Sequence, residues 1–585
     1  MTETKIELEM VDTSAKRESV LTPSNMNIYT NLADLKKSEI DVYRYGTLEK
    51  NTFSLDGNEN ILSRNATPEN TCYCSEIMSD ANGDFATPIT MQIDFNTYHT
   101  SAGITLVFGD ESWASRVKTQ YYRDGALIAE QTFEPDAKDY WLRINMVAYY
   151  NKIMITFYGT SIPYRFLKIE KILYGAIETF SGEQVMSAST AHNINLLSSE
   201  LEINTLKFKI NDNTRMFSIT NKQGYYDDIQ TNQRLKVYER KNENEYFLGT
   251  YYLTKWSNSN VSTADFTAQD TVGLLDSYTF NGGIYKNKNS GALIDSILAA
   301  AGITDYTIEQ ELTEAELSGY IPLTTCRKAL QQVLFAVGGV CDTTGTLTMK
   351  IYKPQRDIVQ NIVGDKNKLY DTTKVEMNKK VSGIEISLFN YELEEEPTEL
   401  SKGYLDGTNK IEFGKAVDPS TLVGTNCTIE EAGNNYCIIT TDDVETEYTL
   451  TGVAYEETEI KKNVSRILMD NIPENILTVT DCKLINESNY EEITARIFDH
   501  YNGSYKTTVK ILSSNEAVGN LISVGVFNNA RLIGNATSVA NDLSGGFIST
   551  ITIDNAIIKA GYEEVYITGQ DNLYCGLEEI RGTIL

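Results

Sequence analysis

TLKFKIN, residues 205–211, alternates apolar and polar side chains along its whole length. Leu206, Phe208 and Ile210 fall on one face of an extended chain, which is the period expected of a half-buried β-strand. The same alternation recurs between turn residues along most of the chain, and it predicts sandwiches and barrels. Other clear strands are GITLVFG (103–109), KIMITFYG (152–159), RLKVYER (234–240), TLTMKIY (346–352) and TTVKIL (507–512).

Helices are expected in only a few places. Residues 290–303 (SGALIDSILAAAGI) carry apolar positions before a closing Gly302, and residues 488–503 (SNYEEITARIFDHYNG) stop at Gly503. In the second stretch, Ser488 and Glu491 have the spacing of a capping box. The fold class predicted from these patterns is mainly β with minor α, in several domains.

A third helix is expected within YIPLTTCRKALQQVLFAVGG, residues 320–339. Thr324 or Thr325 can cap it, and Gly338 follows its last turn. Cys326 belongs to the apolar stripe of this helix, which predicts a thiol packed as a small hydrophobic group. The alternative is a reactive thiol, because a helix N-terminus and Arg327 can lower a cysteine pKa.

Length and charge restrict the function classes. The chain has 585 residues, more than one core normally supports, so several domains are expected. Its 51 basic and 81 acidic residues give a net charge of −30, which disfavours specific binding of nucleic acid. We expect no secretory signal, no membrane-spanning segment and no disulfide framework from the eight scattered cysteines.

The pattern of strands, helices and polar stretches divides the chain into six predicted parts. The segment around 390–403, with several glutamates, is predicted to be an exposed loop. The parts are an N-terminal arm (1–25), a jelly-roll-like or carbohydrate-binding-like β-sandwich (26–178), a β-barrel domain (179–275), an α+β domain (276–375), a β-rich domain (376–470) and a β-rich C-terminal domain (471–585).

No catalytic, cofactor-binding or metal-binding residue is predicted. His99, His192 and His500 lack the spacing of metal ligands, and the known motifs for nucleotide binding and for serine hydrolases are missing. The glutamates near residue 395 follow one loop, whereas glycoside hydrolysis needs two carboxylates across a cleft. The expectation is therefore a binding or assembly protein and not an enzyme, with no cofactor.

Four aromatic residues in the first β-rich part form the only candidate ligand surface in the sequence. Trp113, Tyr121, Tyr122 and Trp141 lie around the turn YYRDG. Aromatic rings on the rim of a sandwich can stack on sugars, so these residues are candidate glycan contacts. The alternative is packing in a core or an interface, which large amphipathic rings do more often.

From residue 205 onward the sequence resembles the baseplate hub proteins of phage tails and contractile bacteriocins. The resemblance rests on an order of short motifs, LKFKINDNTRMFSIT (206–220), RLKVYERKNENEYFLGTYYLTKW (234–256), DFTAQDTVGLLDSYTFNGGIY (265–285), ALIDSILAAAGI (292–303) and LSGYIPLTTCRKALQQVLFAVGGVCDTTGTLTMKIYKP (317–354). It covers residues 205–375 well, and residues 376–585 only in general character.

This resemblance implies a structural function in the tail or tail-like particle, with hub-type barrel domains. It implies a homotrimeric ring that joins the hexameric tail tube to the tip. The implied partners are the tail tube or distal tail protein, the tape measure protein, the spike or tip protein and other baseplate components. The implied location is the baseplate or tip, after synthesis in the bacterial cytoplasm. Whether the particle contracts, and whether it is a phage or a bacteriocin, stays open.

The first β-rich part resembles the jelly-roll modules of tail proteins, which are similar to discoidin-type and carbohydrate-binding sandwiches. The matching stretches are AGITLVFGDE (102–111), YYRDGALIAEQTF (121–133) and the long run 140–175. The second hypothesis is therefore a tail protein that binds a receptor or a cell-wall glycan through residues 26–178. A third, a secreted glycoside hydrolase, lacks the signal peptide and the carboxylate pair.

Overall fold

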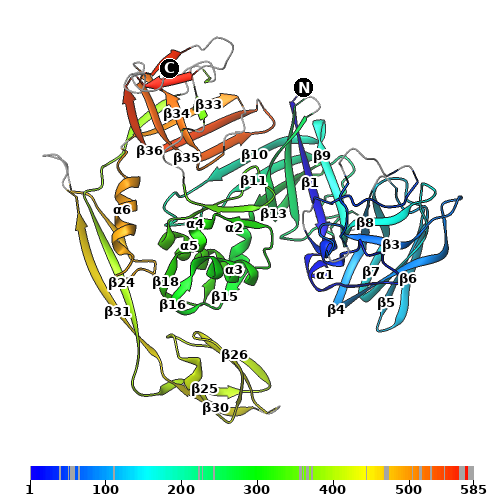
Figure 1. Cartoon of the computed structure of the whole chain (residues 1–585), viewed down its shortest axis with the longest axis horizontal. Coiled ribbons are helices and arrows are strands. Elements are labelled where there is room, and N and C mark those ends of the chain that lie inside the picture. Colours follow the sequence, from blue (N-terminus) through cyan, green and yellow to red (C-terminus); the bar gives the residue numbers. More distant parts are fainter. Residues whose placement is uncertain are drawn as a thin grey trace.

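A computed structural model describes most of the chain (Figure 1). The predicted boundary near residue 470 and the end of the predicted C-terminal part fall outside the described residues. The described residues are 2–37, 41–50, 52, 59–63, 66–109, 112–221, 224–226, 228–241, 244–354, 359, 361–363, 368–369, 373–442, 445–466, 474–503, 505–512, 517–527, 530–545, 547–560, 562–565 and 573–576.

The first compact part is a seven-stranded sheet that folds over its own core. Its two long central strands, β4 (Asp84–Phe108) and β7 (Asp139–Gly159), pair along much of their lengths. Register shifts around Ser101 bend this pair, so both halves of β4 contribute buried side chains to one core. The other strands are β2 (Val20–Pro23), β3 (Tyr73–Met78), β5 (Val117–Arg123), β6 (Ala126–Phe133) and β8 (Phe166–Leu173).

A second, thirteen-stranded sheet runs through the middle of the molecule and covers two separate cores. The predicted strand 205–211 is its β11, in the predicted position and with the predicted face buried. In order, the main path is β23 (Lys374–Met377), β33 (Tyr505–Leu512), β36 (Ile548–Ala560), β35 (Ala530–Asp542), β10 (Val185–Asn193), β11 (Thr205–Asn211), β14 (Thr263–Gln269), β13 (Asn244–Asn260), β12 (Arg234–Lys241), β1 (Thr2–Val11) and β9 (Gly175–Ser181). Beside this path, β34 (Leu521–Gly525) pairs with β35, and β22 (Asn361–Val363) pairs with β34.

The prediction of an N-terminal arm is wrong for residues 2–11. They form strand β1, which lies between β9 and β12. Ile6, Leu8 and Met10 alternate with polar residues, and all three are buried in the core of the second sheet. The period-two pattern therefore includes the N-terminus. A short helix follows, α1 (Thr13–Glu18), and it packs on β4 of the first sheet.

A buried histidine fastens α1 to the sandwich. His99 on β4 lies between two carboxylates of the N-terminal segment, with His99 Nδ1 2.8 Å from Asp12 Oδ2 and Nε2 in contact with Glu18. Asp12 also caps α1 by accepting from the backbone N–H of Ser14 and Ala15. The N-terminal segment thus joins the two sheets, with β1 in one and α1 on the other.

The expected barrels are not closed in the described part of the chain. The seven strands from β9 to β10 surround one core, and the short turn Gly182–Gln184 links these two end strands. β10 nevertheless pairs with β11 and β35, and not with β9. Because both edges of β10 are already paired, these strands do not close into a barrel. They form part of one open, extended sheet.

The α+β part contains the two helices predicted between residues 276 and 375. Helix α3 (Ser290–Ala300) and helix α5 (Cys326–Val337) pack together in its core. The remaining elements are α2 (Thr271–Leu274), the 3₁₀ turn Leu275–Ser277, β15 (Thr279–Phe280), β16 (Gly283–Asn289), β17 (Tyr306–Ile308), α4 (Gln310–Thr313), β18 (Glu316–Ile321), β19 (Thr324–Thr325), β20 (Val340–Asp342) and β21 (Met349–Tyr352).

The packing interpretation of Cys326 is confirmed. Its side chain is fully buried on α5, and Thr325 caps this helix by accepting from the backbone N–H of Lys328. Burial raises the pKa of the Cys326 thiol to about 11, although the thiol lies at a helix N-terminus. Arg327 points instead to Asp276, with Nε 2.7 Å from Oδ2.

We therefore expect Cys326 to stay unmodified when the folded protein is treated with a thiol-specific reagent at pH 8. The thiolate is the reactive form, and burial disfavours it. Peptide mass spectrometry measures the modified fraction, and the half-exposed Cys427 serves as the comparison within the same chain. Labelling of Cys326 as fast as Cys427 in the folded state would contradict the packing interpretation.

Residues 374–512 add a projecting hairpin and one helix. Helix α6 (Tyr490–His500) is confirmed, but Asn489 and not Ser488 occupies its N-cap, so the predicted capping box is wrong. The predicted loop at 390–403 is mostly strand, because β24 (Gly383–Leu393) ends within it and β25 (Thr398–Leu405) begins there. β24 lies between β31 (Tyr455–Ser465) and β32 (Ile476–Val479).

Two small sheets are inserted at the end of this hairpin (Figure 1), and Asn434 and Asn435 join them to the α+β part through hydrogen bonds with Ile284 and Tyr320. They share a small core around Cys437, Ile439, Tyr448 and Leu450. Their strands are β25, β26 (Thr408–Glu412), β27 (Val423–Thr425), β28 (Thr428–Ala432), β29 (Tyr436–Thr440) and β30 (Thr446–Gly452); a last pair is β37 (Tyr562–Val565) and β38 (Leu573–Gly576).

The mainly-β, multidomain fold predicted from the alternation is confirmed. The other predicted domain boundaries stay predictions. Among the described helices, none has the length and hydropathy needed to cross a membrane.

Candidate functional site

The sandwich carries a pocket whose floor is made by the pairing of β3 with β8. These antiparallel strands align Tyr73 with Ile169 and Cys74 with Lys168. The segment before β3 lies across them: Thr30 Oγ1 donates to the Cys74 carbonyl at 2.7 Å, and the Tyr43 N–H donates to the Asn70 carbonyl at 2.8 Å. The pocket is therefore formed by a loop tied to a two-stranded floor.

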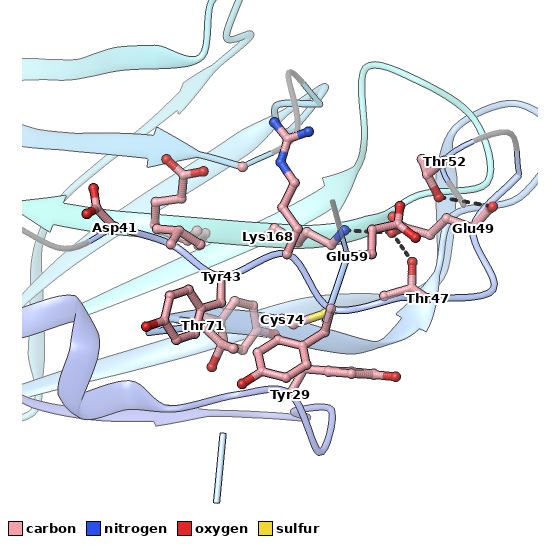
Figure 2. A pocket seen from close by; sticks show the side chains of 17 residues that line it. Tyr29, Asp41, Tyr43, Thr47, Glu49, Thr52, Glu59, Thr71, Cys74 and Lys168 are labelled. Atoms are coloured by element: carbon pink, nitrogen blue, oxygen red, sulfur yellow. Dashed lines mark hydrogen bonds and ion pairs between the residues drawn. The ribbon is translucent and has the colours of Figure 1, made fainter. Parts of the chain in front are cut away.

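The pocket has a volume of about 650 Å³, which is within the usual range for small-ligand sites. Tyrosine rings gather on one side of it, and charged side chains lie on the other (Figure 2). The lining residues are Tyr29, Asp41, Val42, Tyr43, Arg44, Tyr45, Thr47, Glu49, Thr52, Glu59, Thr71, Tyr73, Cys74, Gly109, Lys168, Ile169 and Glu170.

A buried ion pair holds the charged side of the pocket in place. Lys168 Nζ lies 2.6 Å from Glu49 Oε2, and the same oxygen accepts from Thr47 Oγ1 at 2.6 Å. The other oxygen of Glu49 accepts from the backbone N–H of Phe166 at 2.9 Å. The Glu49 side chain is fully buried, and each of its contacts is a charge-assisted hydrogen bond. The carboxylate is therefore held rigidly, and both of its oxygens already have partners.

The aromatic side combines fixed and exposed rings. The Tyr29 and Tyr45 rings have centroids 5.8 Å apart, and the Tyr29 hydroxyl donates to the Gly46 carbonyl at 2.9 Å. Tyr73 is fully buried, whereas Tyr43 is 46% exposed at the mouth. Such rings offer an apolar face to a ligand and a polar edge to water.

Two buried polar atoms of the lining have no hydrogen-bond partner within the described structure, Glu59 Oε2 and Thr71 Oγ1. Leaving a buried polar atom unpaired costs about 1–3 kcal/mol, and more for a charged group. Such atoms in a pocket wall indicate a site for a polar ligand that supplies the missing donors.

The four aromatic residues selected from the sequence do not form one surface. Tyr121 is fully buried and packs edge-to-face on Tyr150, with ring centroids 5.1 Å apart, so it cannot contact a glycan. Tyr122 follows it on β5 and faces the opposite side of the strand. Trp113 is half-buried against the core of the sandwich.

Trp141, the fourth residue, packs at the junction of the two sheets. Its ring lies 4.9 Å from the Arg143 guanidinium and 6.3 Å from the Tyr225 ring. None of the four lines the pocket. For Tyr121 and Trp141 the structure therefore favours the packing alternative.

The residues that do line the pocket carry a weak signal in the sequence. DVYRYGTLE, residues 41–49, is rich in tyrosine and charge but lacks the alternation of a strand. Their assembly depends on the register of β3 on β8, which joins segments about ninety residues apart, as in the pair Cys74–Lys168. Within the described residues, no cluster of three or more histidine, cysteine or acidic side chains is placed to hold a metal ion.

No protein-family model matches the sequence, and no curated protein matches it. Among solved structures, the chain is similar to the tail protein from Neisseria meningitidis MC58, at 9% identity and a TM-score of 0.39, over 64% of this chain and 93% of that one. The 43 kDa tail protein of prophage MuSo2 from Shewanella oneidensis is similar at 13% identity and a TM-score of 0.36, over 64% of this chain and 95% of that one.

A family 32 carbohydrate-binding module from C. perfringens, solved in complex with galactose, is also similar, at 13% identity and a TM-score of 0.19. That match covers 29% of this chain and 99% of the module. At these values each likeness is one of fold over part of the chain.

Proposed function

We propose that this chain is a structural protein of a phage tail or phage-tail-like particle and that it acts as the baseplate hub. In this function three copies form a ring that joins the hexameric tail tube to the tip or spike. Its partners are the tube or distal tail protein, the tape measure protein and other baseplate components. The motif order in residues 205–354 supports the proposal, since it resembles that of such hubs.

The observation that carries the proposal is the projecting hairpin of β24 and β31. Within the described chain, β31 (Tyr455–Ser465) pairs with β24 alone, and after Tyr455, whose N–H donates to the Ala416 carbonyl at 2.8 Å, its other edge has no backbone partner. Leu393 and Ile460 on this hairpin are 45% and 46% exposed. Free strand edges and exposed apolar side chains are typical of surfaces that another subunit covers.

The charge of the chain fits a passage for DNA or for an extended tape measure. At a net charge of −30, the surface repels phosphate groups, so nucleic acid would pass without binding. We also propose that the protein is not an enzyme and works without a cofactor. It would be made in the bacterial cytoplasm and incorporated at the baseplate or tip.

Labelled electron microscopy tests the location. Particles are purified from the producing strain, and gold-conjugated antibodies against this chain are applied. The gold is expected at one end of the tail, with few copies per particle. Labelling along the whole tube, or particles that contain no copy of this chain, would contradict the hub.

A second candidate function is recognition of a cell-wall glycan by residues 26–178. The pocket beside β3 and β8 favours it, because an aromatic side, a polar side and two unpartnered oxygens suit a ligand with many hydroxyl groups. Tyr43→Ala removes the exposed ring at the mouth and is expected to weaken sedimentation of the protein with purified cell walls. Equal sedimentation of the two forms would count against this pocket.

A further inference from the structure

The charges that line the pocket are unbalanced. Among the described lining residues there are four carboxylates, Asp41, Glu49, Glu59 and Glu170, and two cationic side chains, Arg44 and Lys168. Lys168 is already committed to Glu49 at 2.6 Å. Glu170 pairs at 2.9 Å with Lys138, which is not a lining residue. Asp41 and Glu59 remain, and the single charge of Arg44 cannot neutralise both, so net negative charge stays on the described lining.

Glu59 is the carboxylate with the strongest need for a ligand. Its Oε2 is buried and has no hydrogen-bond donor among the described residues. A buried, unpaired carboxylate oxygen is unfavourable, and a cation that donates hydrogen bonds removes the penalty. A primary ammonium group supplies three donors, enough to satisfy this carboxylate oxygen and leave two for other acceptors.

The aromatic side of the pocket can also bind a positively charged group. The faces of tyrosine rings are electron-rich and attract cations within about 6 Å of the ring centre. Tyr29, Tyr43 and Tyr45 bring such rings to the lining. A sugar that stacks on these rings can direct a positive substituent either to the ring faces or to the carboxylates opposite. An anionic sugar would instead meet the excess of carboxylates in a chain of net charge −30.

We propose that this pocket binds an amino sugar with a free, protonated amino group, which pairs with Glu59. The inference rests on the second candidate function, glycan recognition by the sandwich. It adds the class of sugar, a hexosamine whose nitrogen is not acetylated. Neutral and acidic sugars satisfy the hydroxyl-binding atoms of the pocket but leave Glu59 without its cation.

Two disaccharides that differ only in acetylation test the proposal. The full-length protein is titrated calorimetrically at pH 6 with the β-1,4 disaccharide of glucosamine and with that of N-acetylglucosamine. The glucosamine disaccharide is expected to bind at least tenfold more tightly, and added salt is expected to weaken it selectively. Glu59→Gln, which keeps the shape and removes the charge, is expected to abolish most of this preference.

A control carboxylate separates the pocket from general attraction to an acidic protein. Glu76 is an exposed residue of β3 outside the lining, so Glu76→Gln should leave both affinities unchanged. Equal affinities for the two sugars, or equal losses in Glu59→Gln and Glu76→Gln, would overturn the amino-sugar inference. If neither disaccharide binds, the inference also fails, and cell-wall sedimentation of Tyr43→Ala then decides whether glycan recognition by the pocket survives.

Discussion

Replacing Arg234 by methionine is expected to destabilise the junction of β1 and β12 by about 3–5 kcal/mol. Arg234 forms two hydrogen bonds to Glu9, Nε to Oε2 at 2.9 Å and Nη2 to Oε1 at 2.6 Å. The two side chains are only 10% and 8% exposed. Burial alone would raise the pKa of Glu9, but the charge and hydrogen bonds of Arg234 lower it to about 2. Without Arg234, the buried carboxylate of Glu9 keeps Lys236, whose Nζ lies 3.6 Å from Oε1, as an ion-pair partner.

Hydrogen exchange of peptides 2–11 and 234–241 measures the local effect, because these peptides report the opening of this strand pair. Arg240→Met on the same strand is the matched control. Arg240 pairs with Glu3 and Glu245 at the surface, where water and salt screen an ion pair and its contribution to stability is small. The double change Glu9→Gln with Arg234→Met should recover much of the loss. If Arg234→Met and Arg240→Met reduced protection from exchange equally, the buried Glu9–Arg234 pair would not be what holds β1 against β12.

Asp270 is expected to lower the stability of the protein by about 2–3 kcal/mol as the pH rises from 5 to 8, a contribution that His192 opposes because burial lowers its pKa to about 4. Asp270 is 1% exposed between β14 and α2. Its Oδ1 accepts from the Gly273 N–H at 3.1 Å, and its Oδ2 accepts from Thr343 Oγ1 at 2.7 Å. Burial raises its pKa to about 7, and these hydrogen bonds only partly oppose that shift.

The sign follows from the proton balance. The pKa of Asp270 is higher in the folded chain, about 7, than in the unfolded chain, about 4. The folded state therefore binds the proton more tightly, and the full contribution to stability is present below pH 4. It declines as the pH rises and is lost above pH 7. The neighbouring Asp342, whose pKa burial also raises, acts in the same direction.

Asp270→Asn resembles the protonated form and should flatten the dependence of stability on pH. Urea unfolding of the wild type and the variant at pH 5 and pH 8 gives the two slopes. Asp418→Asn is the control, since Asp418 caps the short turn Pro419–Thr421 near the surface and should not change the slope. The same pH slope in wild type and Asp270→Asn would show that Asp270 is ionised without penalty.

Period-two alternation predicted the strands well where one face of the strand is buried. Leu206, Phe208 and Ile210 follow it, and so do Ile6, Leu8 and Met10 at the N-terminus, where the glutamates between them suggested a polar arm. What the alternation cannot indicate is the partner of a strand. Residues 2–8 pair with residues 235–241, and a contact so distant in sequence depends on the whole fold.

The same limit applies to the candidate site. Of the aromatic residues chosen from the strands and their turn, Tyr121 is a core residue, because alternating strand positions face inward, and Trp141 packs at the junction of the two sheets. The pocket instead uses Tyr29, Tyr43 and Tyr45 from a segment without alternation, and Lys168 from a distant strand. Their proximity is set by tertiary hydrogen bonds such as the one from the Tyr43 N–H to Asn70, which have no local pattern in the sequence.

The molar mass of the purified chain tests the central proposal, the trimeric hub, most directly. Light scattering after size-exclusion chromatography, at micromolar concentration, is expected to give the mass of three copies of the 65.6 kDa chain. Lys461→Pro, at a position of β31 whose N–H points away from β24, should shift the population toward one copy, because proline removes a backbone donor from the exposed edge. A wild-type protein that stays at the mass of one copy, even with the tail tube and spike proteins present, would contradict the hub.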